Sequence, residues 1–269
     1  MNEHIDKKRS PLYEVERGIK GVRSDGIILV NKPSGWTSFD VCNKIRHLTG
    51  IKKVGHSGTL DPMATGVLPI FLGKATKFVQ YFLEGDKGYS GEMTLGVRTD
   101  TGDATGEIRN PKSEIRNNTE ISITQIQNIF KKYIGEIEQV PPMYSAIKID
   151  GQRLYKLARQ GIEIERKPRK ITIYDLQILE PSDQGNLRLN VAVSLIRFTV
   201  RCSKGTYVRQ LVVDIGDDLG CGAHLSKLER TYSHPFTITQ TLDIVTIENL
   251  IKLGKLDTVL FAPEDFLPK

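Results

Sequence analysis

The chain has 269 residues, of which 39% are hydrophobic and 26% are charged, a composition that fits a soluble globular protein with a sizeable core. No apolar stretch approaches the ~20 residues that span a bilayer, and the N-terminus lacks the apolar core of a signal peptide. The net charge of +6 suits a polyanionic partner and suits an ordinary basic enzyme equally well.

Residues 1–25 have the features of a mobile tail. They carry six basic and five acidic side chains, a net +1, so +5 of the +6 belongs to the remainder. A mixed-charge terminus with few apolar residues does not contribute to a core. We therefore expect the folded domain to occupy residues 26–269.

The first elements are predicted from short apolar runs. Residues 27–30 predict a buried strand. Thr37 or Ser38 can cap a following helix, which Gly50 ends. The apolar face of this helix is expected to contain residues that recur every three positions, namely Phe39, Cys42, Ile45 and Leu48.

The rest of the chain mixes strands and helices. Residues 99–106 are rich in Thr, Asp and Gly but lack the full EF-hand pattern, which predicts a polar turn. A helix over 208–219 is indicated by apolar residues on one face, with Gly220 as its stop. The other predicted elements are strands at 67–72, 89–97, 170–180 and 187–202, and helices at 123–133 and 152–160. Without regular βαβ alternation, this order favours an α+β fold.

Cysteine and histidine patterns argue against two kinds of site. The three cysteines are too scattered for a disulfide framework or a CxxC metal site, which predicts a reducing, cytoplasmic setting. The five histidines show no metal-ligand spacing, so no metal is expected.

The segment GHSGTLDPMATG, residues 55–66, concentrates glycines, a histidine and an aspartate between two apolar stretches. Gly55, Gly58 and Gly66 permit backbone angles that a side chain forbids, and Pro62 favours an extended Asp61. Taken alone, the pattern is more often a tight turn with a solvated aspartate.

The longer segment GHSGTLDPMATGVLPIFLGKATKF resembles the catalytic motif of the tRNA pseudouridine synthase B (TruB) family. Four further blocks resemble that family in the same order: NKPSGWTSFDV, DKGYSGEMTLGVRTDTGDATG, PPMYSAIKIDGQRLYKLARQG and RCSKGTYVRQLVVDIGDDLGCGAHLSKLER. The resemblance runs from about residue 26 to about residue 263. It implies a long, mostly antiparallel mixed sheet, flanked by helices around a central cleft.

The resemblance also implies the roles of individual residues. Asp61 would be the catalytic aspartate, Arg209 its ion-pair partner, and Tyr89 an active-site tyrosine that stacks on the uracil or moves a proton. Four other positions would contact or support the substrate: His56 in the RNA loop, Tyr207 and Leu228 at the pocket, and Lys32 beneath the active-site loop.

The implied substrate is the T arm of tRNA, with the uridine at tRNA position 55 flipped out for isomerisation. Phosphate contacts are expected from five basic residues taken as a group: Lys74, Lys77, Arg153, Lys156 and Arg159. The reaction needs no cofactor or metal, and no protein partner is implied. Many family members continue into a small C-terminal RNA-binding domain, which we expect to be absent here because the chain stops at Lys269.

Two other classes of function compete with this interpretation. One is a non-catalytic RNA-binding or tRNA-folding module, which would tolerate loss of the aspartate. The other is a glycoside hydrolase, which would usually need paired carboxylates. The sequence shows no second carboxylate beside the catalytic motif.

Overall fold

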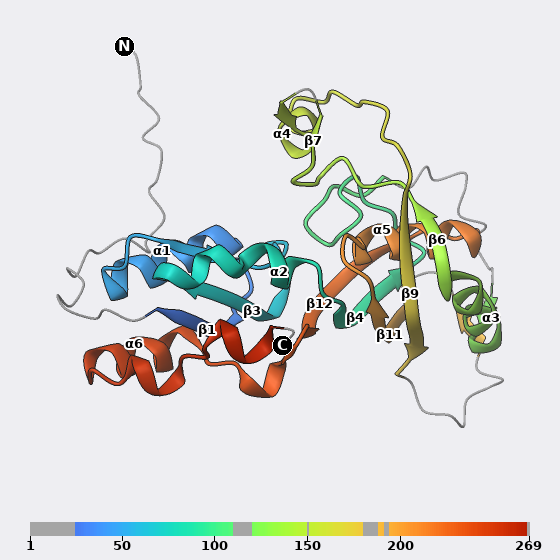
Figure 1. The fold of residues 1–269 in the computed structure, drawn as a ribbon. Coiled ribbons are helices and arrows are strands. Elements are labelled where there is room, and N and C mark those ends of the chain that lie inside the picture. The colour runs from blue at the N-terminus through green and yellow to red at the C-terminus, as the bar shows by residue number, and fades with distance from the viewer. Residues whose placement is uncertain (1–24, 110–119, 150, 180–187, 191–193, 268–269) are drawn as a thin grey trace, which may run out of the picture.

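The computed structural model describes residues 25–109, 120–149, 151–179, 188–190 and 194–267. Within them, a nine-stranded mixed sheet has the order β1-β3-β12-β4-β11-β9-β6, with β2 paired to β3 and β13 paired to β12 (Figure 1). These strands are β1 Gly26–Lys32, β2 Val54–His56, β3 Thr65–Leu72, β4 Lys87–Leu95, β6 Gly135–Gln139, β9 Arg169–Ile178, β11 Ser194–Cys202, β12 Ala223–Ser233 and β13 Phe236–Thr237. Two small hairpin sheets join β5 Glu120–Ser122 to β10 Arg188–Asn190, and β7 Lys148–Ile149 to β8 Gln152–Arg153.

Helices flank both ends of the main sheet. The α-helices are α1 Ser38–Thr49, α2 Val79–Leu83, α3 Ile123–Tyr133, α4 Leu154–Ala158, α5 Val208–Asp218 and α6 Ile244–Lys252. Short 3-10 turns cover Gly73–Phe78, Ile238–Gln240, Leu256–Val259 and Pro263–Phe266. The predicted α+β class is confirmed, since every strand pair of the main sheet is antiparallel except β3 with β12.

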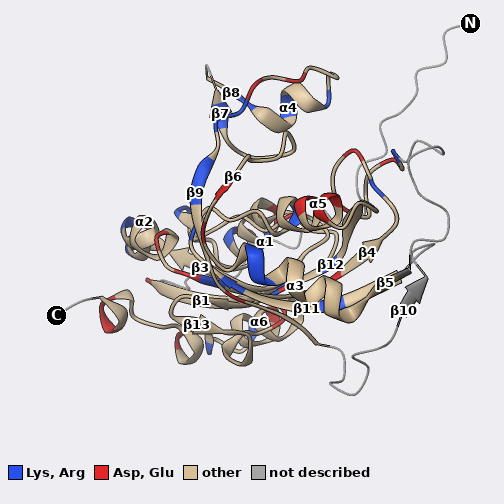
Figure 2. Cartoon of the chain, turned by 90° about the vertical axis from the view of Figure 1, so that its right-hand side faces the viewer, with Lys and Arg blue, Asp and Glu red and all other residues tan. Residues whose placement is uncertain are grey.

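The strand β12 joins the two ends of the sheet. In Figure 1, β1, β3, α1, α2 and α6 lie on the left and β9, β6 and α3 on the right, with β12 between them. Helix α5 packs against β12 and α3 against β9. The β7–β8 hairpin and α4 project from the body in both views (Figures 1 and 2).

The strand β1 shows why the left end is stable. Its side chains alternate between two cores: Ile28 and Val30 face the large one, and Ile27 and Leu29 face a smaller aromatic one with Phe71, Phe82 and Phe236. A strand covered on both faces reads as a continuous apolar run, which is the pattern at 27–30. The sequence prediction for this strand is therefore confirmed.

The helix α1 begins and ends where the sequence predicted, but its buried face differs. Thr37 is the N-cap and forms a capping box with Asp40, and Gly50 ends the helix at a φ of 70°. Phe39, expected on the apolar face, is 63% exposed. At about 100° per residue, a constant three-residue step turns Phe39 and Leu48 to opposite sides of the helix. The buried face is instead Ser38, Val41, Cys42, Ile45 and Thr49.

Two other predicted elements need correction. The strand expected at 187–202 is two strands in different sheets, β10 and β11, with residues 191–193 outside the described part. The helix expected at 152–160 begins only at Leu154, because the two preceding residues pair with β7. The helix at 208–219 is confirmed as α5, and Gly220 follows it at a φ of 73°.

Of the tail proposed at residues 1–25, residues 1–24 lie outside the described part of the chain. Asp25 is described, and its Oδ1 accepts a 2.8 Å hydrogen bond from the backbone N–H of Lys74. Near the other end, Phe261 exchanges backbone hydrogen bonds with Ile27 of β1 at 2.8 and 2.9 Å. Residues up to Leu267 are thus part of the same packed unit as β1.

Candidate active site

The turn that carries Asp61 connects β2 to β3. Gly58 in this turn has a φ of 100°, a conformation that favours glycine. The backbone N–H of Ala64 donates a 3.0 Å hydrogen bond to the carbonyl of Asp61, which closes the turn. Gly55 lies in β2 and Gly66 in β3, so of the three motif glycines Gly58 alone shapes the loop itself.

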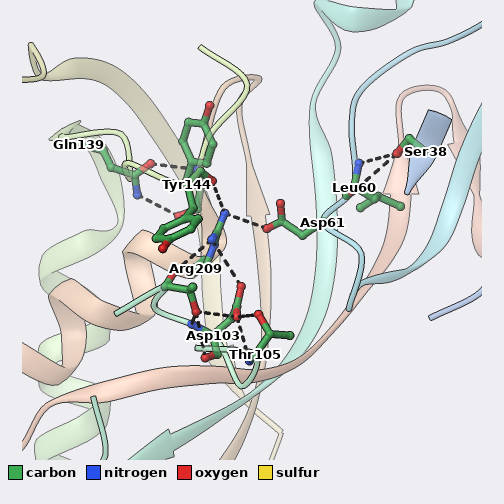
Figure 3. Close-up of polar contacts among 10 residues, drawn as sticks. Ser38, Leu60, Asp61, Asp103, Thr105, Gln139, Tyr144 and Arg209 are labelled. Carbon is green, nitrogen blue, oxygen red and sulfur yellow. Dashed lines mark hydrogen bonds and ion pairs between the residues drawn. The ribbon is translucent and has the colours of Figure 1, made fainter. Parts of the chain in front are cut away.

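Two neighbouring elements hold this turn from beneath. Lys32, fully buried at the end of β1, donates from Nζ to the carbonyls of Trp36 at 2.6 Å, Pro33 at 2.9 Å and Pro62 at 3.2 Å. Ser38, at the start of α1, accepts from the backbone N–H of Leu60 at 2.9 Å (Figure 3). Burial lowers the pKa of Lys32 to about 8. The negative charge of the nearby Asp61 carboxylate has the opposite effect and raises this pKa. Lys32 therefore supports the turn of Asp61 from a position without access to solvent.

Arg209 meets Asp61 from the opposite side. It stands in the first turn of α5 with only 5% of its side chain exposed, and its Nη2 lies 3.1 Å from Oδ2 of Asp61. The guanidinium also donates to the carbonyl of Tyr144 at 2.8 Å and to that of Thr101 at 3.1 Å. Asp61 itself keeps 37% of its side chain exposed, so the carboxylate is anchored and still accessible.

A second carboxylate shares the same arginine, which corrects the prediction that none accompanies the motif. Oδ2 of Asp103 lies 3.4 Å from Nη1 of Arg209 (Figure 3). Oδ1 of this buried side chain accepts three hydrogen bonds, from the hydroxyls of Thr101 at 2.8 Å and Thr105 at 2.5 Å and from the Thr105 N–H at 3.0 Å. Because its oxygens are all engaged, Asp103 acts as a fixed counter-charge and not as an open acid.

The environment of Asp61 sets its ionisation. The pKa of the Asp61 carboxyl is raised above its ordinary value of 3.8, mainly because the group is buried. The positive charges of Arg209 and Lys32 lower this pKa, whereas the neighbouring Asp103 raises it further. The raised pKa means that this site favours the neutral acid more than water does. Arg209 and Lys32 are the groups that oppose this.

Tyr89 lies in the middle of the sheet, on β4. It pairs with Val200 on one side and Arg230 on the other, and it is 9% exposed. Burial raises the pKa of the Tyr89 hydroxyl to about 12, and the charge of its cross-strand neighbour Arg230 opposes this rise. The ring is part of the large core.

Tyr207 and Gln139 fix the start of α5. The carboxamide of Gln139 accepts from the Tyr207 N–H at 2.9 Å and donates to the Tyr207 carbonyl at 3.1 Å. Burial raises the pKa of the Tyr207 hydroxyl. Since Arg209 follows two residues later, this clamp fixes the position from which its side chain extends.

The two remaining predicted residues lie on either side of the turn. Leu228 on β12 lines a cavity of about 420 Å³, together with Met63, Thr65 and Ala104. A second cavity of about 290 Å³ lies against Arg209, Thr101 and Tyr144. His56 ends β2, partly buried, and burial and the Arg230 charge lower its pKa. The structure thus brings Asp61, Arg209 and Lys32 together and places His56 near Arg230.

The expected phosphate contacts divide between two places. Lys74 and Lys77 lie in the 3-10 turn after β3, and the other three lie on β8 and around α4, the projecting arm on which Figure 2 marks basic residues in blue. All five are exposed.

No cluster of three or more potential metal ligands occurs in the described part of the chain, and within it no helix is long and apolar enough to cross a membrane.

Comparisons with known proteins identify the class and then the family. The model described as "TruB family pseudouridylate synthase (N terminal domain)" matches residues 46–208, and that described as "tRNA pseudouridylate synthase B C-terminal domain" matches residues 209–261. These matches place the chain among the pseudouridylate synthases. Within that class, it belongs to the TruB family.

Curated and solved relatives agree with this assignment. The chain is 47% identical over 243 residues to a tRNA pseudouridine synthase B of Geobacillus thermodenitrificans (strain NG80-2), covering 90% of this chain and 78% of that protein. It is 44% identical over 245 residues to the Francisella philomiragia protein of the same name, covering 91% and 77%. The structure titled "Crystal Structure of a Cbf5-Nop10-Gar1 Complex" has a TM-score of 0.63 and 30% identity, covering 87% of this chain and 56% of that one.

Sequence reasoning missed the residues that act through buried polar contacts. The prediction of a polar turn at 99–106 gives Asp103 no role, although Thr101 and Thr105 each stand two positions from it, a spacing that can saturate a buried carboxylate. Gln139 and Arg230 carry no local signal, because their partners Tyr207, Gly58, Val67 and Tyr89 are distant in the sequence.

Proposed function

We propose that this protein isomerises the uridine at tRNA position 55, in the T arm, with Asp61 as the catalytic carboxylate. The type of reaction follows from the family, which converts uridine in tRNA to pseudouridine. The observation that carries the residue assignment is the accessible Asp61 carboxylate, 3.1 Å from a buried guanidinium on a turn held by Lys32 and Ser38.

The chemistry requires an ionised carboxylate. The N1–C1′ glycosidic bond breaks, the uracil turns, and a C5–C1′ bond forms. Asp61 assists by attack at C1′, by attack at C6 of uracil or by driving elimination to a glycal, and each route begins from the carboxylate anion. Because burial raises the pKa of Asp61 and substrate RNA excludes further water, a positive partner is needed.

Arg209 is proposed to be that partner. One edge of its guanidinium faces Asp61 and the Tyr144 carbonyl, and the other faces Asp103 and the Thr101 carbonyl. A planar fork anchored at both ends cannot swing away from Asp61 when substrate enters. Asp103 thereby positions Arg209, at the expense of raising the pKa of Asp61.

Other residues are proposed to shape the base pocket. Tyr89 is proposed to contact the base with its ring and hydroxyl, and Leu228 to form an apolar wall next to Met63 in the larger cavity. Tyr207 stabilises the start of α5, and Lys32 stabilises the turn. His56 is proposed to enter the RNA loop as a neutral imidazole, since its pKa is lowered by burial.

The T arm is proposed as the substrate because the target base is buried there and must be flipped out, which costs a few kcal/mol. Exposed basic side chains on two separate elements can offset that cost by contacting phosphates: Lys74, Lys77, Arg153, Lys156 and Arg159. We also propose a cytoplasmic location and action without a protein partner, on the sequence argument alone.

The experiment is incubation of the protein with a synthetic T-arm RNA, followed by mapping of pseudouridine and assay of free uracil. Pseudouridine at position 55 supports the proposal. Binding without product would indicate an RNA-binding module, and free uracil a hydrolase. A T-arm RNA with cytidine at position 55 is the matched control and should give neither product.

A further inference from the structure

We propose that Arg230 is a positioning residue for Tyr89: its guanidinium fixes the phenol oxygen and thereby turns the hydroxyl proton toward the substrate. This inference rests on the proposed function, because it assumes that Tyr89 faces the substrate. Arg230 is 1% exposed, and it is the largest of the fully buried side chains. Arg230 has no role in the mechanism proposed for Asp61 and Arg209.

The contacts of Arg230 are made entirely with neutral groups in the described part of the chain. Its Nε donates to the carbonyl of Val67 at 2.8 Å and its Nη2 to that of Gly58 at 3.1 Å, and Tyr89 is its cross-strand neighbour on β4. A buried cation without a carboxylate is costly, and burial lowers its pKa. A charge kept at such a cost calls for a role that a packed apolar side chain could not fill.

The backbone places this guanidinium at the junction of the catalytic elements. On β12, Arg230 pairs with Gly66 of β3 on one side and with Tyr89 of β4 on the other. A Cβ on Gly66 would lie 2.3 Å from the Arg230 carbonyl, and a Cβ on Gly58 would lie 3.2 Å from its Nη1. The two glycines thus make room for Arg230 between the turn of Asp61 and the strand of Tyr89.

The direction of the Tyr89 hydrogen bond follows from the chemistry of arginine. A guanidinium only donates, so the phenol oxygen accepts and its own proton must point elsewhere. The same positive charge favours the phenolate over the phenol. Lys87, another buried cation near Arg230, donates to the carbonyls of Gly85 at 2.6 Å and Phe82 at 3.5 Å and is committed to that loop.

A double-mutant cycle tests the proposal. Single-turnover rates on T-arm RNA are measured at saturating protein for the wild type, Arg230→Lys, Tyr89→Phe and the double variant, with melting temperatures alongside. We expect Arg230→Lys to slow the reaction by roughly tenfold or more, and to add almost nothing in the Tyr89→Phe background. Independent effects that multiply in the double variant would overturn the proposal, because a merely structural arginine would slow both backgrounds equally.

A second measurement decides the case if Arg230→Lys fails to fold or if the wild type makes no pseudouridine. The guanidinium ¹⁵N signals of Arg230 are compared by NMR between the wild type and Tyr89→Phe, which keeps the arginine. We expect these signals to move in Tyr89→Phe and to stay in place in the control Tyr133→Phe, on α3. Unchanged signals in Tyr89→Phe would refute the contact and with it the proposal, whereas a missing product in the wild type counts against the proposed function only.

Discussion

Arg209 and Asp103 form a buried ion pair, with Nη1 of the arginine 3.4 Å from Oδ2 of the aspartate. The pair lies behind the contact of Arg209 with Asp61, so one guanidinium serves two carboxylates that are far apart in the sequence. The other oxygen of Asp103 accepts three hydrogen bonds, which hold its carboxylate in place beside Arg209. The active site is therefore a charged network, and its members should respond to each other's removal.

The first prediction concerns this coupling. Asp103 raises the pKa of Asp61, so Asp103→Asn should lower that pKa. The rate requires ionised Asp61 and rises with pH through its pKa, so the acid limb of the single-turnover profile should move to lower pH. The plateau rate should fall, because Arg209 loses one anchor. Asp175→Asn, the same change on β9, is the control; a limb that stays in place or moves to higher pH would refute the coupling.

A second prediction concerns the shape of the cation. Arg209→Lys keeps the charge but should lose most of the single-turnover rate, because an ammonium cannot contact Asp61 and Asp103 with opposite edges of one plane. Arg201→Lys is the control, since this exposed arginine of β11 contacts the rings of Tyr174 and Tyr232 and not the site. Equal rates for Arg209→Lys and the wild type would remove Arg209 from the mechanism.

The two properties of Tyr89 can be separated by substitution. Tyr89→Phe should keep the ring and bind T-arm RNA normally, while Tyr89→Leu should weaken binding, with ~1–3 kcal/mol at stake for a stacked base. Both variants should be slow in the chemical step, since both lose the hydroxyl that we propose Arg230 positions. Binding and single-turnover assays measure the two effects; wild-type behaviour in both variants would make Tyr89 a core residue only.

Lys32 predicts a dependence of stability on pH. Its pKa is lowered from 10.5 to about 8 in the folded state, so between these values the unfolded chain binds more protons. The free energy of unfolding that is due to Lys32 should therefore rise with pH across that window. Urea unfolding of the wild type and Lys32→Met should diverge in favour of the wild type from about pH 8 upward. The exposed lysine variant Lys132→Met is the control, and a difference that shrinks with pH would contradict the buried-lysine account.

Local signals in the sequence were enough to predict much of the fold. The cap at Thr37, the stop at Gly50 and the apolar stripe of α5 depend on neighbours within a few residues. The prediction of one continuous strand at 187–202 was wrong, because an apolar run does not indicate which sheet each part of it joins. The prediction that Phe39 is buried was wrong because residues spaced three apart do not stay on one face of a helix with 3.6 residues per turn.

The site was predictable only where the family motifs carried it. Asp61, Arg209 and Lys32 meet as the resemblance implied. Asp103 and Arg230 did not stand out, because a buried charge is recognised by its partners, and these come from other strands and loops. Their interactions depend on β12 being inserted between β3 and β4, which no local pattern indicates.

The most direct test of the central claim is the single-turnover conversion of T-arm RNA by Asp61→Asn. The variant keeps the shape of the side chain and loses the anion, so we expect no pseudouridine at position 55. RNA binding should stay within about tenfold of the wild type, a change of ~1.4 kcal/mol or less. Deamidation is excluded by mass spectrometry of the protein. Full conversion by the intact asparagine variant would contradict the account, because the reaction would then not depend on the Asp61 carboxylate.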